Sequence, residues 1–413
     1  MKNSTFDLIV IGGGAAGFFG AICAAEKKPG LSVLILEKTT KLLSKVRISG
    51  GGRCNVTNNC FETAALSRHY PRGEKALKQL FKTFQARDTV EWFLSKGVTI
   101  VAEEDGRMFP ITDSSQTIID CFLTEAERLK VEIETSEGVV AIKKEAESFS
   151  VITQSETTYY AKKILVATGG HANPNAYQFL ESVGHAIIKP IPSLFTFNDS
   201  VKDFKDLMGV AVQNAEVKIA GTKLSQVGPV LITHWGLSGP AVIKLSAWAA
   251  EHLHQLNYNF TALVSWIGSF KEDDIREYLI NYKRDHGKQK VFSNPLFGIP
   301  QRLWLRLCEL AEIEETKIWA ELPQKNINKL MESMIRCPFQ IRGKTTFKDE
   351  FVTCGGVDLK EINLETMESK LIKNLFFAGE VTNMDGETGG FNFQAAWTTS
   401  YVAAQTITEI INS

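Results

Sequence analysis

The sequence predicts an α/β protein in which a domain built on a parallel sheet is interrupted by an inserted domain of strands and helices. Three observations support this fold class. The chain opens with a strand-helix-strand pattern and closes with a buried strand and a long helix. The stretch from about 191 to 349 instead has strand-like pieces followed by a charged, helix-rich segment. We therefore expect the two ends of the chain to share one domain.

The elements of this outer domain are predicted from apolar periodicity and from glycine and proline stops. Phe6 to Ile11 is a β-branched apolar run, and Ala15 to Lys28 is a helix that stops before Pro29-Gly30. Ser32 to Leu36 is the next strand, which gives a right-handed β-α-β unit. Further on we expect two helices within Glu74 to Lys96 with a break near Arg87-Asp88, a strand near Val98 to Val101, a helix from about Ser115 to Leu129, a meander of Val131 to Lys143, Ser148 to Gln154 and Thr158 to Val166, a strand at Leu375 to Ala378, and a helix from Asn392 to Ile411.

The domain boundaries are placed where the pattern of predicted strands and helices changes. Residues 1–190 and 350–413 are assigned to the outer domain, and 191–349 to the insert. Within the insert, about 191–268 and 336–349 form the predicted β part, and the charged stretch of about 269–335 forms the helical part.

Length and composition limit the classes of protein to consider. With 413 residues the chain exceeds the usual limit of about 250 to 300 for one core, so at least two packed units are expected. The 46 basic and 47 acidic residues give a net charge of −1, which provides no overall attraction for nucleic acid or anionic membrane. We predict a small-molecule substrate and neither nucleic acid nor membrane as a partner, although this charge is compatible with a local basic patch. The sequence does not indicate an oligomeric state.

The cysteines and the apolar N-terminal stretch bear on location and on metals. The seven cysteines form no Cys-x-x-Cys pair and no metal-ligand spacing, which favours a reducing cytoplasm and no metal site. Leu8 to Ala25 carries no charge, yet its five glycines suit a strand-turn-helix better than a signal peptide or a membrane span. A cytoplasmic location is expected.

A glycine-rich turn between the first strand and helix is typical of dinucleotide binding. Gly12-Gly13-Gly14-Ala15-Ala16-Gly17 satisfies G-x-G-x-x-G: Gly12 permits the tight turn, Gly14 permits approach of a pyrophosphate, and Gly17 permits close packing. The helix N-terminus supplies N–H groups and partial positive charge. Glu37 ends the second strand and is placed to accept hydrogen bonds from ribose hydroxyls.

Further glycine junctions favour FAD over NAD(P), because both cofactors share the ADP half that the first motif binds. Arg47 to Asn55 combines glycines with nearby cations (Lys45, Arg47, Arg53) for phosphates or an anionic ring, although a plain flexible loop is the alternative. Leu165 to Gly170 and Phe376 to Glu380 are two more strand-to-glycine junctions. Gly386 to Gly390 precedes the last helix, whose N-terminus could face the N1–C2 edge of a flavin. An extended ligand touched by both ends of the chain, with no second G-x-G-x-x-G, is predicted to be FAD.

The motifs together resemble the BaiN-like bacterial flavoproteins. The segments that carry the resemblance are the glycine turn with Glu37, Ser49-Gly-Gly-Gly-Arg-Cys-Asn55, Gly106-Arg-Met-Phe-Pro110, Thr233-His-Trp-Gly-Leu-Ser-Gly-Pro240, Gly355-Gly-Val357, and Ala378-Gly-Glu-Val381 through Gly389-Gly390. The resemblance implies a Rossmann-like FAD-binding domain of the glutathione-reductase class and an FAD-dependent, NAD(P)-linked or O2-linked oxidoreductase; one relative is an aminoacetone oxidase, and others have a proposed role in bile-acid metabolism. It further implies FAD contacts at Gly12, Gly14, Ala16, Gly17, Glu37, Lys38, Gly52, Asn55, Gly379 and Glu380, and at the backbone of Val140.

The full predicted cofactor site combines both lines of argument. It consists of Gly12, Gly14, Ala15, Ala16, Gly17, Glu37, Lys38, Lys45, Arg47, Gly51, Gly52, Arg53, Cys54, Asn55, Val140, Ala167, Thr168, Gly169, Gly379, Glu380, Gly389, Gly390, Asn392 and Gln394.

The candidate catalytic residue is His234, which precedes Trp235 and the helix start at Gly239-Pro240. A histidine of near-neutral pKa could exchange a proton while a hydride moves to or from flavin N5, whereas a packed structural role is the alternative. His171 is a second candidate near the nucleotide. Cys54 and Cys60 are separated by five residues, one more than in the redox pairs of disulfide reductases, so ordinary free thiols are the alternative to a flavin-linked dithiol.

The predicted function is that of an FAD-dependent oxidoreductase that passes hydride through flavin N5 between a small-molecule donor and an acceptor. NAD(P)H is a candidate transient donor, and O2 or an organic molecule a candidate acceptor. Two alternatives stay open: a non-catalytic flavin-binding redox sensor or scaffold, and a fumarate-reductase-like enzyme.

Overall fold

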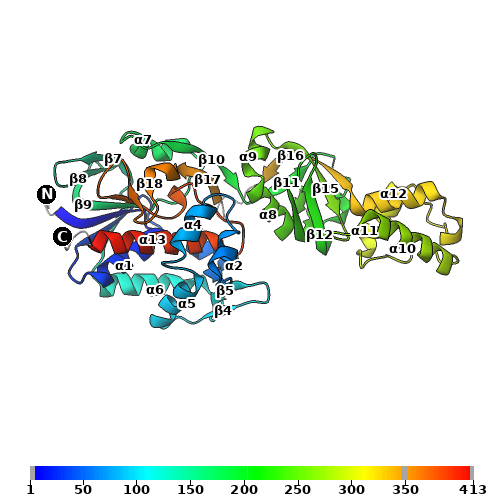
Figure 1. Ribbon diagram of the computed structural model, residues 1–413, viewed down its shortest axis with the longest axis horizontal. Coiled ribbons are helices and arrows are strands. Elements are labelled where there is room, and N and C mark those ends of the chain that lie inside the picture. The colour runs from blue at the N-terminus through cyan, green and yellow to red at the C-terminus, as the bar shows by residue number, and fades with distance from the viewer. Residues whose placement is uncertain (1–4, 202, 346–351, 410–413) are drawn as a thin grey trace. The chain divides into compact units, whose positions relative to one another are not determined.

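A nine-stranded mixed sheet joins the two ends of the chain in the computed structural model, which describes residues 5–201, 203–345 and 352–409 (Figure 1). Five strands are parallel, in the order β20-β9-β1-β2-β6. Their bounds are β1 Thr5–Ile11, β2 Val33–Glu37, β6 Glu132–Thr135, β9 Thr158–Val166 and β20 Leu375–Phe377. Because β1 pairs with β2 on one side and β9 on the other, the strand order reverses at β1, the position where open α/β sheets bind their ligands.

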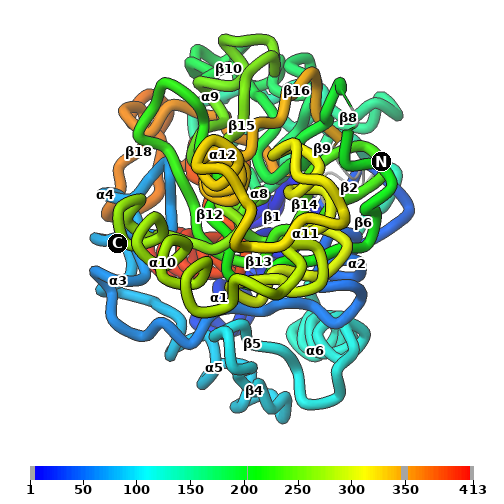
Figure 2. Tube along the Cα trace, turned by 90° about the vertical axis from the view of Figure 1, so that its right-hand side faces the viewer, coloured from blue at the N-terminus to red at the C-terminus, as the bar shows by residue number. Residues whose placement is uncertain are grey.

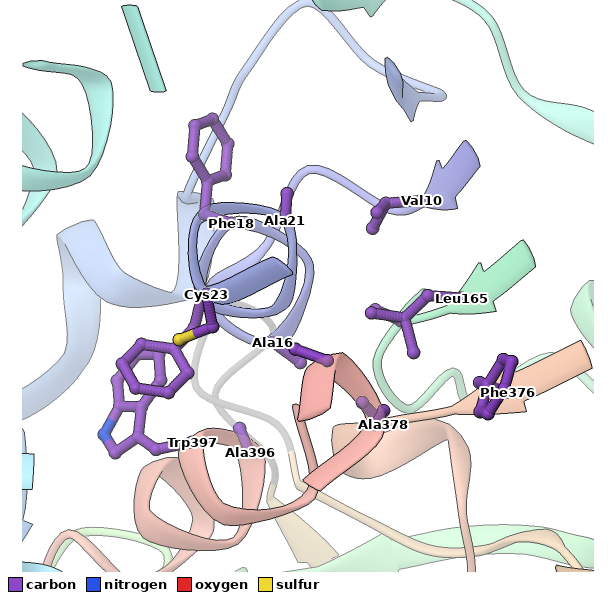
Figure 3. Packing of buried hydrophobic residues seen from close by; sticks show 14 of the residues in the cluster. Val10, Ala16, Phe18, Ala21, Cys23, Leu165, Phe376, Ala378, Ala396 and Trp397 are labelled. Carbon is purple, nitrogen blue, oxygen red and sulfur yellow. The ribbon is translucent and has the colours of Figure 1, made fainter. Parts of the chain in front are cut away.

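The central strands are apolar along their whole length because both faces of the sheet are covered. Leu8, Ile9 and Val10 of β1 are fully buried, as parallel strands with helices on both sides require. Helix α1 (Ala15–Lys27) follows β1, and the long C-terminal helix α13 (Phe391–Glu409) packs beside it (Figure 3). The Ser400 hydroxyl donates to the carbonyl of Ala16 at 2.8 Å, so helices α1 and α13 contact each other directly.

The remaining elements of this unit surround the sheet. An antiparallel ribbon continues it beyond β20, β7 and β8 form a meander with β9, and β3, β5 and β4 form a small separate sheet. The bounds are α2 Ser44–Gly52, β3 Thr57–Asn58, α3 Thr63–Ser67, α4 Glu74–Leu80, α5 Ala86–Ser95, β4 Ile100–Ala102, β5 Arg107–Pro110, α6 Ser115–Arg128, β7 Val139–Lys144, β8 Phe149–Thr153, α7 Gln178–Glu181, β10 Ile187–Ser193, β17 Val352–Val357, β18 Ile362–Asn363 and β19 Glu368–Ser369.

Two predicted elements need correction. The run from Val131 to Lys143 is two strands, because β6 pairs with β2 and the chain turns at Ser136, with φ of 61°, before β7 joins the meander. The break between the helices of Glu74 to Lys96 lies at 81–85, earlier than Arg87-Asp88. Gln85 begins α5 with a capping box that includes Asp88, so the predicted break point is part of the helix start.

A closed antiparallel barrel forms the second unit. Its strand order is β11-β14-β13-β12-β15-β16, and α8 and α9 accompany it. Helices α10, α11 and α12 lie together (Figures 1 and 2). The bounds are β11 Thr196–Asp199, β12 Ala211–Ile219, β13 Ser225–Ile232, β14 Gly236–Ser238, α8 Pro240–Trp248, α9 Ala250–Gln255, β15 Asn259–Ser265, α10 Glu272–Asp285, α11 Gln301–Leu310, α12 Gln324–Ile335 and β16 Cys337–Thr345.

The chain divides into Met1–Ser193 with Lys348–Ser413, and Leu194–Phe347. The predicted domain boundaries lay between residues 190 and 191 and between residues 349 and 350. The second boundary lies outside the described residues, and so does the predicted helix end at Ile411.

Candidate active site

The glycine turn after β1 has the conformation that its spacing predicts. Gly12 has φ of 114°, and a Cβ there would lie 2.4 Å from the carbonyl oxygen of Ala167. A Cβ on Gly17 would lie 1.9 Å from the carbonyl oxygen of Gly12, so both positions exclude any side chain. Gly14 differs, because an added Cβ would meet no atom within 4 Å. The protein needs Gly12 and Gly17 for its own packing, whereas Gly14 borders open space in front of α1.

Glu37 stands at the carboxyl end of β2 beside this turn. Its Oε2 accepts from the N–H of Gly13, and its Oε1 accepts from the N–H and the hydroxyl of Thr39, each at 2.9 Å. A carboxylate has about four acceptor sites, so this orientation leaves capacity for a ribose hydroxyl. Exposed Lys38 and Val140, the latter at a bulge in β7, lie close by, since the N–H of Glu137 donates to the carbonyl of Glu37.

The three strand-to-glycine junctions lie at one edge of the sheet. Val166 pairs with Ile11 and with Phe377, so Gly12, Ala167 and Ala378 each follow the carboxyl end of a neighbouring parallel strand. Gly379 packs so closely on α1 that its Cβ would lie 2.9 Å from the Cβ of Ala16. Beyond Ala167 and Thr168, Gly169 has φ of 73° and open space at its Cβ position.

The loop that was predicted to approach the cofactor begins as a helix and then leaves it. Helix α2 loses helical geometry at Ser49, and Gly50 and Gly51 have φ of 57° and 71°. Added Cβ atoms on Gly51 and Gly52 would meet nothing within 4 Å. Asn55 connects this loop to the turn before α13. With its side-chain amide oriented to match its hydrogen-bond partners, its oxygen accepts from the N–H of Gly390 at 2.9 Å.

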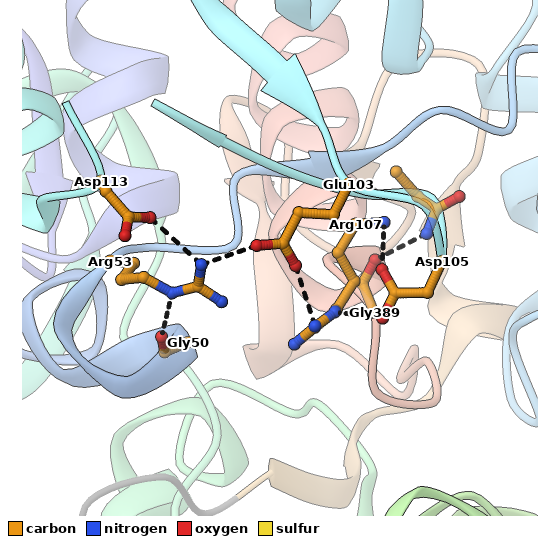
Figure 4. A network of polar contacts seen from close by, with 8 residues as sticks. Gly50, Arg53, Glu103, Asp105, Arg107, Asp113 and Gly389 are labelled. Carbon is orange, nitrogen blue, oxygen red and sulfur yellow. Dashed lines mark hydrogen bonds and ion pairs between the residues drawn. The ribbon is translucent and has the colours of Figure 1, made fainter. Parts of the chain in front are cut away.

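The three predicted cations of this region are held by protein groups. Arg53 donates to Glu103 at 2.7 Å and to Asp113 at 3.1 Å (Figure 4). Its guanidinium lies 3.9 Å from the ring centre of Phe109. Lys45 pairs with Glu380 at 2.7 Å. A further bond runs from Arg47 to the amide oxygen of Gln116 at 2.9 Å. Two carboxylates offset the charge of Arg53, so its role toward a phosphate stays a prediction without support from this geometry.

The start of α13 is fixed by side-chain amides. Asn392 both accepts from and donates to the backbone of Gly386, each bond at 2.9 Å. The amide of buried Gln394 bonds the hydroxyls of Thr57, Thr89 and Thr398. These contacts commit both amides to the protein, while Gly389 and Gly390, with φ of 134° and 90°, shape the turn in front of the helix. The first N–H groups of α13 lack intrahelical partners by the geometry of every α-helix, so they are available to an acceptor.

Two charged pairs at this helix start were not predicted from the sequence. His69 Nδ1 lies 2.7 Å from the carboxylate of Glu387, and the His69 ring stacks on Phe391 with centroids 4.1 Å apart. The side chain of Glu387 is 6% exposed and that of His69 is 34% exposed. Arg72 forms a two-point ion pair with Asp385, which is completely buried and also accepts from the Ser193 hydroxyl at 2.9 Å. No local motif marks these residues. The two segments meet through an isolated bridge between Arg72 and Asp385 and through a bond from the N–H of Glu387 to the carbonyl of His69 at 3.0 Å.

The other candidate residues have less clear settings. His234 is exposed in the second unit, lies edge-on to Trp235, and lines a shallow surface hollow with Asp199 and Lys205. Its catalytic role stays a prediction. Burial and the nearby Lys38 and Lys45 lower the pKa of His171.

The thiols of the predicted redox pair are both free. Burial raises the pKa of Cys54 to about 12, and burial also raises the pKa of the partly buried Cys60. Neither environment favours the reactive thiolate that a flavin-linked dithiol needs.

The residues present fit FAD. Open space lies along Gly14, Gly51, Gly52 and Gly169, where a Cβ would find no neighbour, and α1 begins without any side-chain cap on its N–H groups. An uncapped helix start facing open space matches a pyrophosphate. The N–H groups at the start of α13 would favour an electron-rich edge at the other end of an extended cofactor.

This fold and this site define an FAD-dependent oxidoreductase with a Rossmann-type dinucleotide-binding domain. Within that class the chain belongs to the HI0933-like family, since the family model described as "HI0933-like protein Rossmann domain" matches residues 6–406. The resemblance to BaiN-like flavoproteins is thereby confirmed.

Characterised relatives match the chain over nearly its whole length. It is 29% identical over 410 residues to a protein of Escherichia coli (strain K12) named "Ribosomal RNA dihydrouridine synthase", covering 97% of each chain. It is 27% identical over 409 residues to the "3-dehydro-bile acid delta(4,6)-reductase" of Clostridium scindens, covering 97% of this chain and 98% of that one. A 3-ketosteroid delta1-dehydrogenase from Sterolibacterium denitrificans has the same fold, with a TM-score of 0.53 at 12% identity over 98% of this chain and 100% of that one.

The described residues, 5–201, 203–345 and 352–409, also bear on membrane and metal binding. No helix there is long and apolar enough to cross a bilayer. The same residues contain no group of three or more His, Cys, Asp or Glu side chains that could hold a metal ion.

Proposed function

We propose that this protein reduces a carbon-carbon double bond conjugated with a carbonyl group, using hydride from FAD. The observation that carries the proposal is the His69–Glu387 pair beside the start of α13. It combines a carboxylate-bound, partly exposed imidazole with the helix terminus toward which the flavin ring is predicted to lie. This arrangement suits proton transfer next to a hydride donor.

The names of two relatives support the type of reaction. A dihydrouridine synthase and a delta(4,6)-reductase of a 3-dehydro bile acid differ in substrate size and class. Both names describe the addition of two hydrogens across a double bond in conjugation with a ring carbonyl. The proposed reaction is the chemistry that the two names share.

When bound and reduced, FAD would supply the hydride from N5. The chain's own residues would complete the reaction at the substrate. Addition of hydride to the carbon β to the carbonyl leaves an enolate, whose α carbon then needs a proton. We assign this proton to His69 Nε2, because Glu387 holds the ring through Nδ1 at 2.7 Å. The N–H bond breaks as the C–H bond forms, and water restores the proton. Glu387 acts as a positioning residue.

The electron donor belongs to the same proposal. We assign NAD(P)H as the transient donor that reduces the bound flavin, in keeping with the sequence prediction. If NAD(P)H does not bleach the flavin at a useful rate, the assignment of the donor is wrong, whereas the proposed reduction of the alkene is unaffected.

The test separates the two half-reactions. The flavin is reduced photochemically without oxygen and mixed with uridine, with uridine-containing RNA, with a cyclic enone or with fumarate, and recovery of the oxidised flavin absorbance is followed. Reoxidation by an enone or a uracil is expected. Reoxidation by fumarate alone would favour the fumarate-reductase-like alternative, and no reoxidation by any alkene would favour the sensor or scaffold.

A further inference from the structure

A lysine-lined groove lies on the FAD-binding unit, apart from the glycine turn. Its volume is about 940 Å³, which includes space open to solvent. Lys75, Lys78 and Lys82 line one side, together with Gln79, and Leu364 and Glu365 line the other. A concave surface with three cations on one wall is suited to an extended anion.

The three lysines are available to a ligand. All are exposed, and in the described part of the chain their ammonium groups form no hydrogen bond or ion pair. Lys75 and Lys78 share a face of α4, where the helical rise separates them by roughly 4.5 Å along the axis, and Lys82 lies two residues beyond the helix end. Such a row suits successive phosphates of a flexible strand better than a single small anion.

The acidic groups around the groove are fewer and in part engaged. Glu365 accepts from the amide of Gln79 at 3.4 Å, and Glu74 lies in the first turn of α4. The carboxylate of Glu62 accepts from the N–H of Ala65, and this bond is the main cause of its lowered pKa, to which Lys78 adds. Glu365 is thus the one carboxylate among the groove-lining residues, against three lysines.

The groove is fixed to the flavin end of the site. Helix α4 starts after Gly73, where an added Cβ would lie 2.7 Å from Met384. The preceding residue, Arg72, is clamped to Asp385, and His69 contacts Glu387 in the same pair of segments. A ligand on α4 would therefore lie on the segment that carries the proposed proton donor.

We propose that this groove binds the phosphate backbone of a single-stranded RNA segment whose uracil is the substrate. The inference rests on the proposed reductase function and names its substrate class. Three cations in a row supply the charge complementarity, and a full-length relative is named as an enzyme of ribosomal RNA. It replaces the sequence prediction that nucleic acid is not a partner, which was drawn from net charge alone.

The experiment measures binding of a fluorescent, uridine-rich single-stranded RNA to the full-length, FAD-loaded protein at two salt concentrations. The test variant carries Lys75→Gln, Lys78→Gln and Lys82→Gln. The control carries Lys223→Gln, Lys288→Gln and Lys290→Gln, three exposed lysines of the second unit that give the same change in charge.

Three phosphate contacts predict that the wild type and the control lose affinity roughly 20-fold between about 50 and 200 mM salt. The test variant should bind about tenfold or more weakly at the lower salt and lose most of this dependence. Equal binding by test and control variants, or no RNA binding by the wild type, would overturn the groove.

A second readout keeps the two proposals apart. Reoxidation of reduced flavin by a small enone should be the same in the wild type and the test variant. If the enone reacts but RNA does not bind, the RNA-binding proposal is wrong and the proposed reductase function is kept. Failure of RNA and of every small alkene to reoxidise the flavin would instead remove the proposed function.

Discussion

The two ends of the proposed cofactor site are built in different ways. At the β1–α1 turn, the backbone of Gly12 to Gly17 makes the site, and the fit depends on which glycines lack room for a Cβ. At the start of α13, the proposed proton donor is assembled from side chains far apart in sequence, since His69 and Glu387 are separated by 318 positions. The first end depends on local geometry that tolerates little change, and the second depends on pairs of charges that only the complete fold assembles.

The largest expected effect separates two glycines of the same turn. Gly17→Ala places a Cβ against the carbonyl of Gly12, so we expect loss of soluble folded protein. Gly14→Ala places its Cβ in open space, so the protein should fold with unchanged thermal stability and lose FAD. Melting temperature and flavin content of the two variants are the measurements. A Gly14→Ala protein that retains full flavin would show that this space is not the pyrophosphate site.

The next effect concerns the buried ion pair at the other end. Arg72→Leu leaves the fully buried Asp385 carboxylate without its cation, and breaking such a pair costs about 3 to 5 kcal/mol. Urea unfolding measures the loss, and the double variant Arg72→Leu with Asp385→Leu should recover much of it. A single variant as stable as the wild type would mean that the pair does not hold the start of α13.

The third prediction tests His69 as the proton donor. His69→Asn should slow alkene reduction about 10²-fold or more, because general acid catalysis typically contributes that much. The pH dependence of the rate should flatten as well. Flavin content and reduction of the flavin by NAD(P)H should not change, which a merely structural role of the stacked ring would not predict. Equal rates in the two proteins would return the catalytic assignment to His234.

A smaller effect follows from the buried thiol in the loop between the two ends. The pKa of Cys54 is raised from 9.0 to about 12 by burial, so the folded protein keeps this proton while the unfolded chain loses it above pH 9. The unfolded state then binds fewer protons, and the free energy of unfolding falls as pH rises from 9 toward 12. Between pH 8 and 10.5 the contribution is about 2 kcal/mol. Urea unfolding of Cys54→Ala should show a decline smaller by about that amount; identical declines would mean that Cys54 is not buried in solution.

The contrast also explains how much the sequence could predict. The glycine turn, Glu37 and the flanking elements were predictable because each depends on residues within a short stretch. The same holds for the later strand-to-glycine junctions, which parallel pairing brings to one edge. His69 was not predictable, because Ser67 to Gly73 contains no motif and its partner lies beyond the insert.

Short or tertiary-dependent elements were missed for a related reason. Strands β11 and β14 have four and three residues and depend on barrel closure. The split between β6 and β7 follows from which neighbour each strand pairs with, not from the apolar run they share. Lys45, Arg47 and Arg53 were expected to bind phosphates or an anionic ring, but each has a protein partner far away in the sequence. The partner of Lys45 lies 335 positions away, that of Arg47 lies 69 away, and the two of Arg53 lie 50 and 60 away. Composition cannot reveal such partners.

Titration of the flavin-free protein with FAD and with ADP tests the central claim most directly. ADP reaches only the β1–α1 turn, whereas FAD should also meet the start of α13. We predict binding of one FAD per chain at least about a thousandfold tighter than ADP, equivalent to about 4 kcal/mol. Equal affinities, or a protein that takes up no FAD, would contradict a cofactor held at both ends.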